Sequence, residues 1–170
     1  MEFIDVIRKR YSVREYTDTP VPDDKIARII EVARLAPSGN NRQPWKFIVV
    51  KDPVKRRALG QASNGQDFIG TAPVIIAAIA NDLEWLMPCG VPGYGVDLAI
   101  AAEHIVLAAA DEGLGSCWIG DFSENRVKEI LAIPELFRVF TILPIGYPAR
   151  EGKSPGRKAQ DEIVCLDTFK

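Results

Sequence analysis

The sequence of 170 residues suits a single domain, 1–170, and its 47% hydrophobic and 26% charged content is typical of a soluble globular protein. A formal net charge of −2 argues against a nucleic-acid-binding protein, which more often carries a basic excess. Three scattered cysteines without a CxxC motif argue against a secreted disulfide framework and favour a reducing, cytoplasmic location.

The N-terminal half of the sequence is predicted to alternate helices with buried strands. Ile26, Ile29 and Ala33 follow the spacing of an amphipathic helix, and Asp23 is a suitable N-cap for it. The elements expected are a helix over 2–9, a helix over 23–35, a strand over 47–50, a helix from 53, a loop over 63–70 and a strand over 73–80. The charges of the first helix leave no apolar segment of the kind that a signal peptide needs.

The C-terminal half contains the most apolar helix of the chain, predicted over 96–112. A helix with so little polar face is expected at the centre of the fold or at an interface. Its charged residues interrupt the apolar run, so we expect no membrane span. The further elements expected are a strand over 116–119, a helix over 123–132, a strand over 139–145, a loop or arm over 149–161 and a last strand over 162–166.

The segment 82–95 is predicted to be irregular, and it is unusually rich in large apolar side chains such as Trp85, Leu86 and Tyr94. A loop of this composition can be a lid or a subunit contact. It can equally be a loop that packs on the core of its own chain. The sequence leaves both interpretations open.

The order of the elements indicates an α+β or α/β fold, in which helices cover a sheet. The crossover lengths permit parallel pairing of the strands. The last predicted strand has no obvious neighbour, so it could pair within the chain or on a partner subunit.

The segment Arg10-Tyr11-Ser12-Val13-Arg14 is the first candidate for a binding site. In an extended segment, alternate side chains share a face, which brings Arg10, Ser12 and Arg14 together. Two guanidinium groups beside a hydroxyl form a good receptor for a phosphate or another oxygen-rich anion. The alternative is a helix exit with solvated charges, which the pattern alone does not exclude.

The other candidate motifs, which are a glycine-rich segment, a histidine and the cysteines, do not meet the structural requirements of the sites that they suggest. The glycines of 113–120 follow a helix instead of opening one, so they do not form a dinucleotide fingerprint. His104 is the single histidine and lies within the apolar helix. The sequence therefore has few side chains that could form a hydrolase triad or a histidine-rich zinc site. Cys89 is the best nucleophile among the cysteines, but nothing near it in the sequence lowers its pKa. We expect no metal and no catalytic side chain, which is typical of an enzyme whose cofactor carries the chemistry.

Four motifs in order make the chain resemble the nitroreductase family of FMN-dependent oxidoreductases over nearly its whole length. They are the Arg10-x-Ser12-x-Arg14 segment, the Ala-Pro-Ser-x-x-Asn-x-Gln-Pro-Trp loop at 36–45, the Gly-Leu-Gly-x-x-Trp-Ile-Gly segment at 113–120, and Gly-Tyr-Pro at 146–148 followed by the pair Arg157-Lys158. The resemblance implies a nitroreductase-like α+β fold with a mostly antiparallel central sheet. It also implies a homodimer with two shared FMN sites, in which the C-terminal strand is exchanged with the partner subunit.

The resemblance also implies which residues hold FMN. Arg10, Ser12 and Arg157 would bind the phosphate, and Arg14 would lie near the pyrimidine edge, where its charge stabilises the anionic reduced flavin. The loop of the partner subunit would contribute Pro37, Ser38, Gly39, Asn41 and Gln43. The remaining candidates are Tyr11, Asn64, Gln66, Trp118, Ile119, Gly120, Asp121 and Lys158.

The function implied by this resemblance is reduction of bound FMN by NAD(P)H, followed by reduction of a small acceptor such as a nitroaromatic or a quinone in a ping-pong scheme. A flavin-binding or sequestering protein without turnover is an alternative from another class. Within the enzyme class, relatives also carry out dehalogenation and flavin fragmentation. The resemblance implies neither nucleic-acid binding nor membrane attachment.

Overall fold

A computed structural model of the chain describes residues 2–153 and 155–169. Its centre is a four-stranded sheet in the order β1-β2-β4-β3, and all three pairings are antiparallel. The strands are β1 (Trp45–Val50), β2 (Val74–Ala80), β3 (Gly115–Ser116) and β4 (Arg138–Gly146). The structure therefore confirms the α+β class with an antiparallel sheet, and the parallel pairing that the crossover lengths permitted is not used within it.

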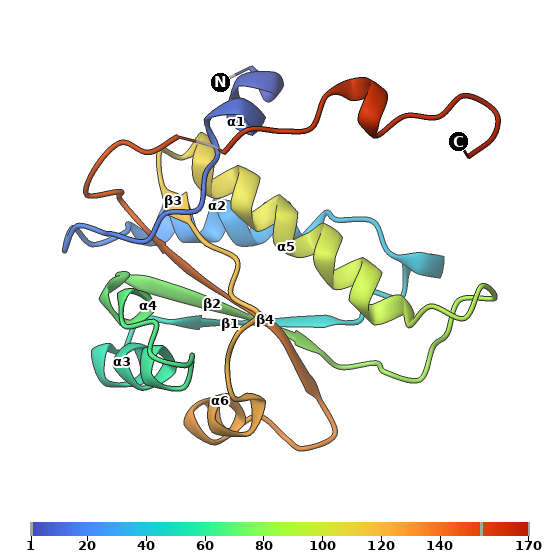
Figure 1. Cartoon of the computed structure of the whole chain (residues 1–170). Coiled ribbons are helices and arrows are strands. Elements are labelled where there is room, and N and C mark those ends of the chain that lie inside the picture. The colour runs from blue at the N-terminus through green and yellow to red at the C-terminus, as the bar shows by residue number, and fades with distance from the viewer. Residues whose placement is uncertain (1, 154, 170) are drawn as a thin grey trace.

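Helices cover both faces of the sheet (Figure 1). On one side lie α1 (Phe3–Lys9), α2 (Asp23–Arg34) and α5 (Gly93–Asp111), and on the other lie α3 (Pro53–Gln61), α4 (Phe68–Thr71) and α6 (Glu124–Leu131). Because side chains alternate across a strand, Ile76 of β2 joins the core under α2 and α5 while Ile75 joins the core under α3 and α6. This two-sided burial explains why β2 is apolar at every position.

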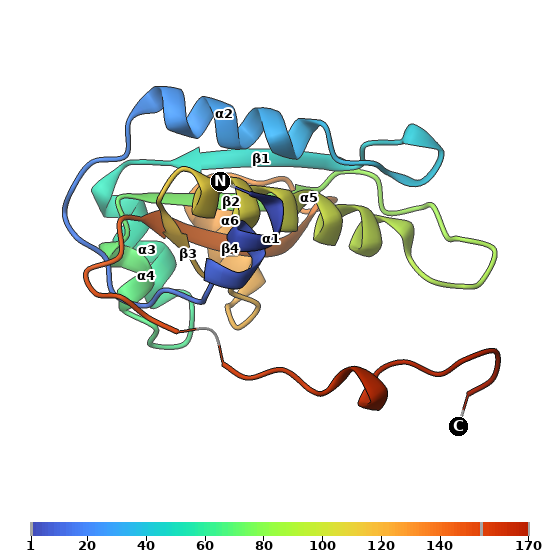
Figure 2. The same ribbon diagram turned by 90° about the horizontal axis from the view of Figure 1, so that it is seen from above.

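Two predicted features are wrong. The loop expected over 63–70 contains the short helix α4, whose Ile69 is fully buried in the core beside Leu59. The strand expected over 162–166 does not form in the described residues, where a single 3₁₀ turn, η2 (Gln160–Glu162), is followed by exposed chain. The arm lies apart from the sheet in Figure 2, so it pairs with no strand of this chain. The predicted exchange of this segment with a partner subunit concerns a second chain, so it stays a prediction.

Helix α5 has the length and hydropathy of a membrane span, but it is the central helix of the fold. Leu98, Ala101 and Ile105 are fully buried, and the helix packs against both α2 and β2. Its apolar character is therefore explained by burial inside this domain.

Candidate functional site

The segment 10–14 is extended, as predicted, and lies beside β3. Arg10 closes α1 with extended backbone angles, and the Val13 amide donates to the Ser116 carbonyl oxygen at 2.9 Å. Ser12 forms an isolated parallel bridge with Ser116. The backbone of this segment is therefore fixed to the edge of the sheet, which leaves the alternate side chains of Arg10, Ser12 and Arg14, here called the anion clamp, on one side.

The arginines of the anion clamp carry no acidic partner among the described residues. The Arg10 guanidinium makes no hydrogen bond there, and that of Arg14 makes one long contact of 3.4 Å to the Ser12 carbonyl oxygen. Burial raises the pKa of the nearby Cys117 thiol, whereas the charges of Arg14 and Arg10 and a hydrogen bond from Ser12 act to lower it. Two uncompensated positive charges beside a hydroxyl suit a phosphate group.

Tyr11 attaches the start of the C-terminal arm beside the anion clamp. Its hydroxyl donates to the Arg150 carbonyl oxygen at 3.0 Å, and its ring covers Gly152 so closely that a Cβ there would lie 2.2 Å from the ring. Tyr11, Ser12, Arg14 and Lys153 line a hollow of about 280 Å³ at this place. The arm is thus anchored next to the proposed anion site.

The segment 118–121, here called the ledge, follows β3 directly. The Trp118 indole donates to the Glu103 carboxylate of α5 at 3.3 Å. The Asn64 amide donates to the Asp121 carboxylate, and the Gln66 amide donates to the Asp121 carbonyl oxygen at 3.2 Å. Asn64 and Gln66, which were candidates for FMN binding, therefore lie at the ledge, where their amides bind the Asp121 side chain and the Asp121 backbone. Ile119 is buried, whereas Trp118, Gly120 and Asp121 are exposed.

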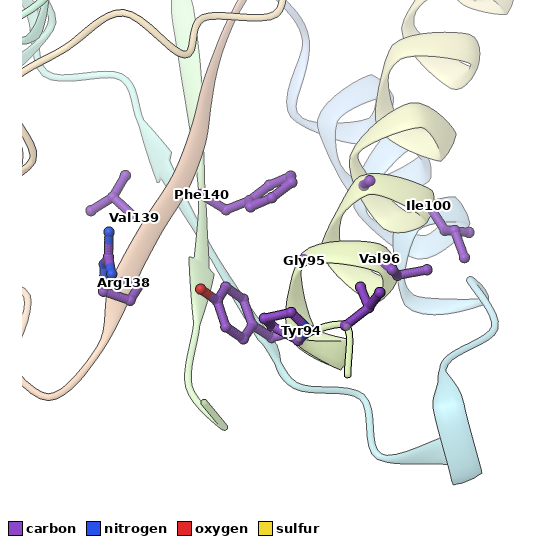
Figure 3. Close-up of a pocket in the computed structure, with 10 residues that line it drawn as sticks. Tyr94, Gly95, Val96, Ile100, Arg138, Val139 and Phe140 are labelled. Atoms are coloured by element: carbon purple, nitrogen blue, oxygen red, sulfur yellow. The ribbon is translucent and has the colours of Figure 1, made fainter. Parts of the chain in front are cut away.

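An aromatic hollow of about 710 Å³ lies between the start of β4 and the first half of α5 (Figure 3). Phe140 projects from the strand and Tyr94 from the helix into this space. The Trp118 ring meets the Phe140 ring edge-on, with centroids 6.2 Å apart, which connects the hollow with the ledge. Arg138 at the rim is neutralised by Glu124 at 2.9 Å, so the hollow is mainly an apolar site.

The loop 37–43 lies at the other end of α5 from the anion clamp (Figure 1). The Gly39 amide donates to the Asp97 carboxylate at 3.0 Å, early in α5, whereas Ser12 meets Ser116 just beyond the end of that helix. A rise of 1.5 Å per residue from Asp97 to the end of α5 separates the two places by roughly 20 Å. One chain therefore does not bring Pro37, Ser38, Gly39, Asn41 and Gln43 to the anion clamp.

The pair Arg157-Lys158 is exposed on the arm. The Arg157 guanidinium donates to the carbonyl oxygens of Pro155 and Gly156, at 2.7 and 3.3 Å, within its own segment. Within a single chain, these two residues do not meet the anion clamp.

The residues set aside in the sequence have structural explanations. His104 is half-buried, with a ring nitrogen 3.3 Å from the Val32 carbonyl oxygen. Cys89 and Cys165 are exposed thiols, and Cys117 is buried. Over the described residues, no group of three potential metal ligands comes together.

Trp85 and Asp97 are functional candidates that the sequence did not identify. Asp97 is one of the charged residues that interrupt the apolar helix; it is 3% exposed, and its carboxylate binds the loop 37–43. A charged residue in the buried stripe of a helix is the signal that could have revealed it.

Comparison with known proteins decides the family. The model of the Nitroreductase family matches residues 7–147. The chain belongs to the nitroreductase family. Over 154 residues, 88% of this chain and 87% of the relative, it is 36% identical to a protein of Archaeoglobus fulgidus named putative NADH dehydrogenase/NAD(P)H nitroreductase.

Solved structures of this family share the fold. A nitroreductase family protein from Clostridium novyi NT is 42% identical, with a TM-score of 0.83 over 87% of each chain. An FMN-dependent nitroreductase from Clostridium difficile R20291 is 32% identical, with a TM-score of 0.86 over 98% of this chain and 99% of that one. The chain is thus a nitroreductase-family oxidoreductase, and it spans nearly the full length of these relatives.

Proposed function

We propose that the chain is an FMN-dependent NAD(P)H oxidoreductase that reduces small acceptors such as nitroaromatics and quinones by a ping-pong mechanism. The observation that carries this proposal is the pair of arginines, Arg10 and Arg14, which flank Ser12 and have no acidic partner among the described residues. Arg10 is half-buried and Arg14 is exposed, and a phosphate monoester offers several acceptor oxygens to two such guanidinium groups.

Each part of the site has a role in this proposal. Arg10 and Ser12 would bind the phosphate, with Arg157 of the arm as a further ligand. Arg14 would lie near the flavin pyrimidine, where its positive charge favours the reduced anion. Backbone groups of the ledge would face the flavin ring, because Asn64 and Gln66 already fix this segment through Asp121.

When bound, FMN would take a hydride from NAD(P)H and give two electrons and two protons to the acceptor, the second proton coming from water. The protein would supply binding and shielding from solvent. The aromatic hollow of Tyr94 and Phe140 (Figure 3) supports planar, apolar acceptors, since its one charged group, Arg138, is neutralised by Glu124.

We infer a homodimer in which each FMN site uses both subunits. The distance between the anion clamp and the loop 37–43 within one chain supports this inference, because only a second copy could bring the two together. Phe3 and Leu35 are 71% and 63% exposed on one side, and Phe169 of the arm is 98% exposed. Exposed apolar groups of this size favour association. Sedimentation analysis tests the inference, and a monomer at all concentrations would contradict it.

We propose a cytoplasmic location, as three scattered cysteines without a CxxC motif suggest.

One absorption experiment tests the main proposal. The purified protein should be yellow, or become so after incubation with FMN, and anaerobic NADH or NADPH should bleach the flavin band. A protein that stays colourless with excess FMN would contradict the FMN proposal. A protein that binds FMN without being reduced, and that turns over no acceptor, would be a flavin-sequestering protein instead.

Reductive dehalogenation is a second candidate, because the relatives also include an iodotyrosine deiodinase of Haliscomenobacter hydrossis, 27% identical over 99% of this chain. Release of iodide from an iodinated phenol, compared with turnover of a nitroaromatic under the same conditions, separates the two activities. The nitroaromatic should be the better substrate, because the aromatic hollow offers no unpaired positive charge for an amino acid carboxylate.

A further inference from the structure

The loop 37–43 holds a backbone conformation that it does not favour by itself. Asn40, Asn41 and Gln43 have positive φ angles of 52°, 56° and 51°, the left-handed region that non-glycine residues rarely adopt. Within the loop, the Asn41 and Arg42 amides donate to the Ser38 and Gly39 carbonyl oxygens at 3.0 and 3.1 Å. The Gln43 amide donates to the Ser38 hydroxyl at 2.9 Å, and the Gln43 side chain donates to Asn41 at 3.2 Å. Such conformations persist where the surrounding structure fixes them.

The Trp85 indole is the first external support of this loop. A Cβ built on Gly39 would lie 2.1 Å from the ring, and a Cβ on Gly93, at the start of α5, would lie 2.0 Å from it. Neither glycine has a positive φ angle, so their backbones would accept any residue. Contact with the ring is therefore what requires glycine at both positions, and the indole is held between the loop and the helix.

Asp97 is the second support, and it acts on the same residue, Gly39. Its Oδ1 atom accepts the Gly39 amide at 3.0 Å, and the side chain is buried. Its Oδ2 atom is buried without a hydrogen-bond partner among the described residues. A carboxylate is seldom buried in this way for stability alone, because an unpartnered buried oxygen costs free energy.

Arg42 connects the loop to the far side of the indole. Its guanidinium lies 5.7 Å from the centre of the Trp85 ring and forms an ion pair with Asp82. The segment 82–92 therefore contacts the loop through the Trp85 ring, which lies against Gly39 and Arg42, and through the ion pair of Asp82 with Arg42. Trp85 thus packs on its own chain, which agrees with one of the two interpretations that the sequence left open.

We propose that Trp85 and Asp97 are positioning residues, which hold the loop 37–43 in the shape that it presents to FMN. The part that concerns FMN rests on the proposed function. The part that concerns the loop rests only on the contacts around Gly39. The role of the segment 82–92 is then to support the loop 37–43 of its own chain. FMN would then bind to a preformed surface, and its binding free energy would not be reduced by ordering of the loop.

Hydrogen exchange of the purified protein tests the support directly. Trp85→Ala should speed exchange of the Gly39 and Gln43 amides by about tenfold or more, because the loop loses its packing partner. Leu86→Ala is the matched control, since Leu86 is a neighbouring large side chain that is 58% exposed, and its exchange should equal that of the wild type. Unchanged exchange in the Trp85→Ala protein would overturn the proposal.

A double-mutant comparison tests the consequence for FMN affinity. Gly39→Ala should weaken FMN binding about tenfold in the wild type, because the new Cβ displaces the ring, and much less in the Trp85→Ala background. If Gly39→Ala raised the FMN dissociation constant by the same factor in both backgrounds, the Trp85 contact would not act through Gly39. If the wild type binds no FMN, the proposed function fails, while hydrogen exchange still decides whether the loop is supported.

Conservative variants test the role of Asp97. Asp97→Asn keeps an oxygen that can accept the Gly39 amide. Its FMN affinity and the slow exchange of its Gly39 amide should both equal those of the wild type. Asp97→Leu removes the acceptor and should speed exchange at Gly39 and weaken FMN binding in parallel. Equal loss in both variants would show that the hydrogen bond to Gly39 is not what Asp97 contributes, and would overturn this part of the proposal.

Discussion

Val13 occupies the space into which a side chain on Gly115 would project. A Cβ built on Gly115 would lie 2.3 Å from the Cγ2 atom of Val13 and 3.0 Å from Pro148. The segment that carries the anion clamp can therefore lie against β3 only because position 115 has no side chain. The position of Arg10 and Arg14 thus depends on a glycine outside the clamp.

Replacing Gly115 with Ala should displace the anion clamp. Overpacking at a buried position typically costs about 1–3 kcal/mol, and here Val13 must move with the backbone of Ser12. We expect a lower unfolding midpoint and weaker FMN binding, measured by denaturant titration and by quenching of flavin fluorescence. In a Val13→Ala background the same change should cost less, because the contact has gone. An equal cost in both backgrounds would contradict this account of Gly115.

Arg10→Ala should weaken FMN binding strongly. A charge-assisted hydrogen bond contributes about 1.5–3 kcal/mol, which corresponds to roughly a 10- to 100-fold rise in the dissociation constant. Equilibrium titration at two salt concentrations measures the loss and its electrostatic part. Arg57→Ala, which removes an exposed arginine of α3, controls for the change in net charge. Equal affinities of the Arg10 and Arg57 variants would show that the phosphate is held elsewhere.

The parts of the fold and site that were predictable are those set by local patterns. The alternation of side chains placed Arg10 and Ser12 on one face, and the apolar run at 74–80 identified the buried strand β2. Contacts between residues distant in sequence were not predictable. Trp85 meets Gly39 across the loop, and Asp97 binds an amide 58 residues away, so no local period reveals either contact.

The two segments that were predicted wrongly, 63–70 and 162–166, also depend on contacts that a local pattern does not reveal. The helix α4 has only four residues, too few for a periodic signal, and it is fixed by burial of Ile69. The segment 162–166 has the composition of a strand but pairs with no strand of its own chain, and pairing rather than composition makes a strand. Arg157 lies on the same arm, and its place in the site therefore stays a prediction that depends on a second subunit.

Acid should destabilise the protein partly through the link between α2 and α5. Hydrogen bonds from Arg28 hold the pKa of Glu112 below its ordinary value of 4.5, and Arg28 also lowers the pKa of Asp24. A lowered folded-state pKa adds stability above the unfolded value, and this stability is lost as the pH falls through the folded value. The unfolding free energy should therefore decrease from about pH 5 to pH 3. Because Arg28 is half exposed, the effect should be modest.

Denaturant titrations across this pH range measure the effect. Arg28→Gln should flatten the dependence, since Glu112 then keeps a pKa nearer its ordinary value. Arg57→Gln removes a comparable exposed charge that has no ion pair among the described residues, and it should leave the slope unchanged. If the unfolding free energy of the Arg28→Gln protein fell with pH as steeply as that of the wild type, the pH dependence would not come from the contact between Arg28 and Glu112.

Cys117 should resist alkylation under native conditions, although it lies beside two arginines. Burial raises the pKa of its thiol, so at neutral pH the thiol stays protonated and its labelling rate should rise only at higher pH. Exposed Cys89 should react faster with iodoacetamide than Cys117, because burial both limits access to the Cys117 thiol and lowers its thiolate fraction. Peptide mass spectrometry separates the two sites. Since Ser12 lies at this thiol, the molecules that do become labelled at Cys117 should be those that lose FMN, and labelled protein with full flavin content would contradict the position assigned to the phosphate.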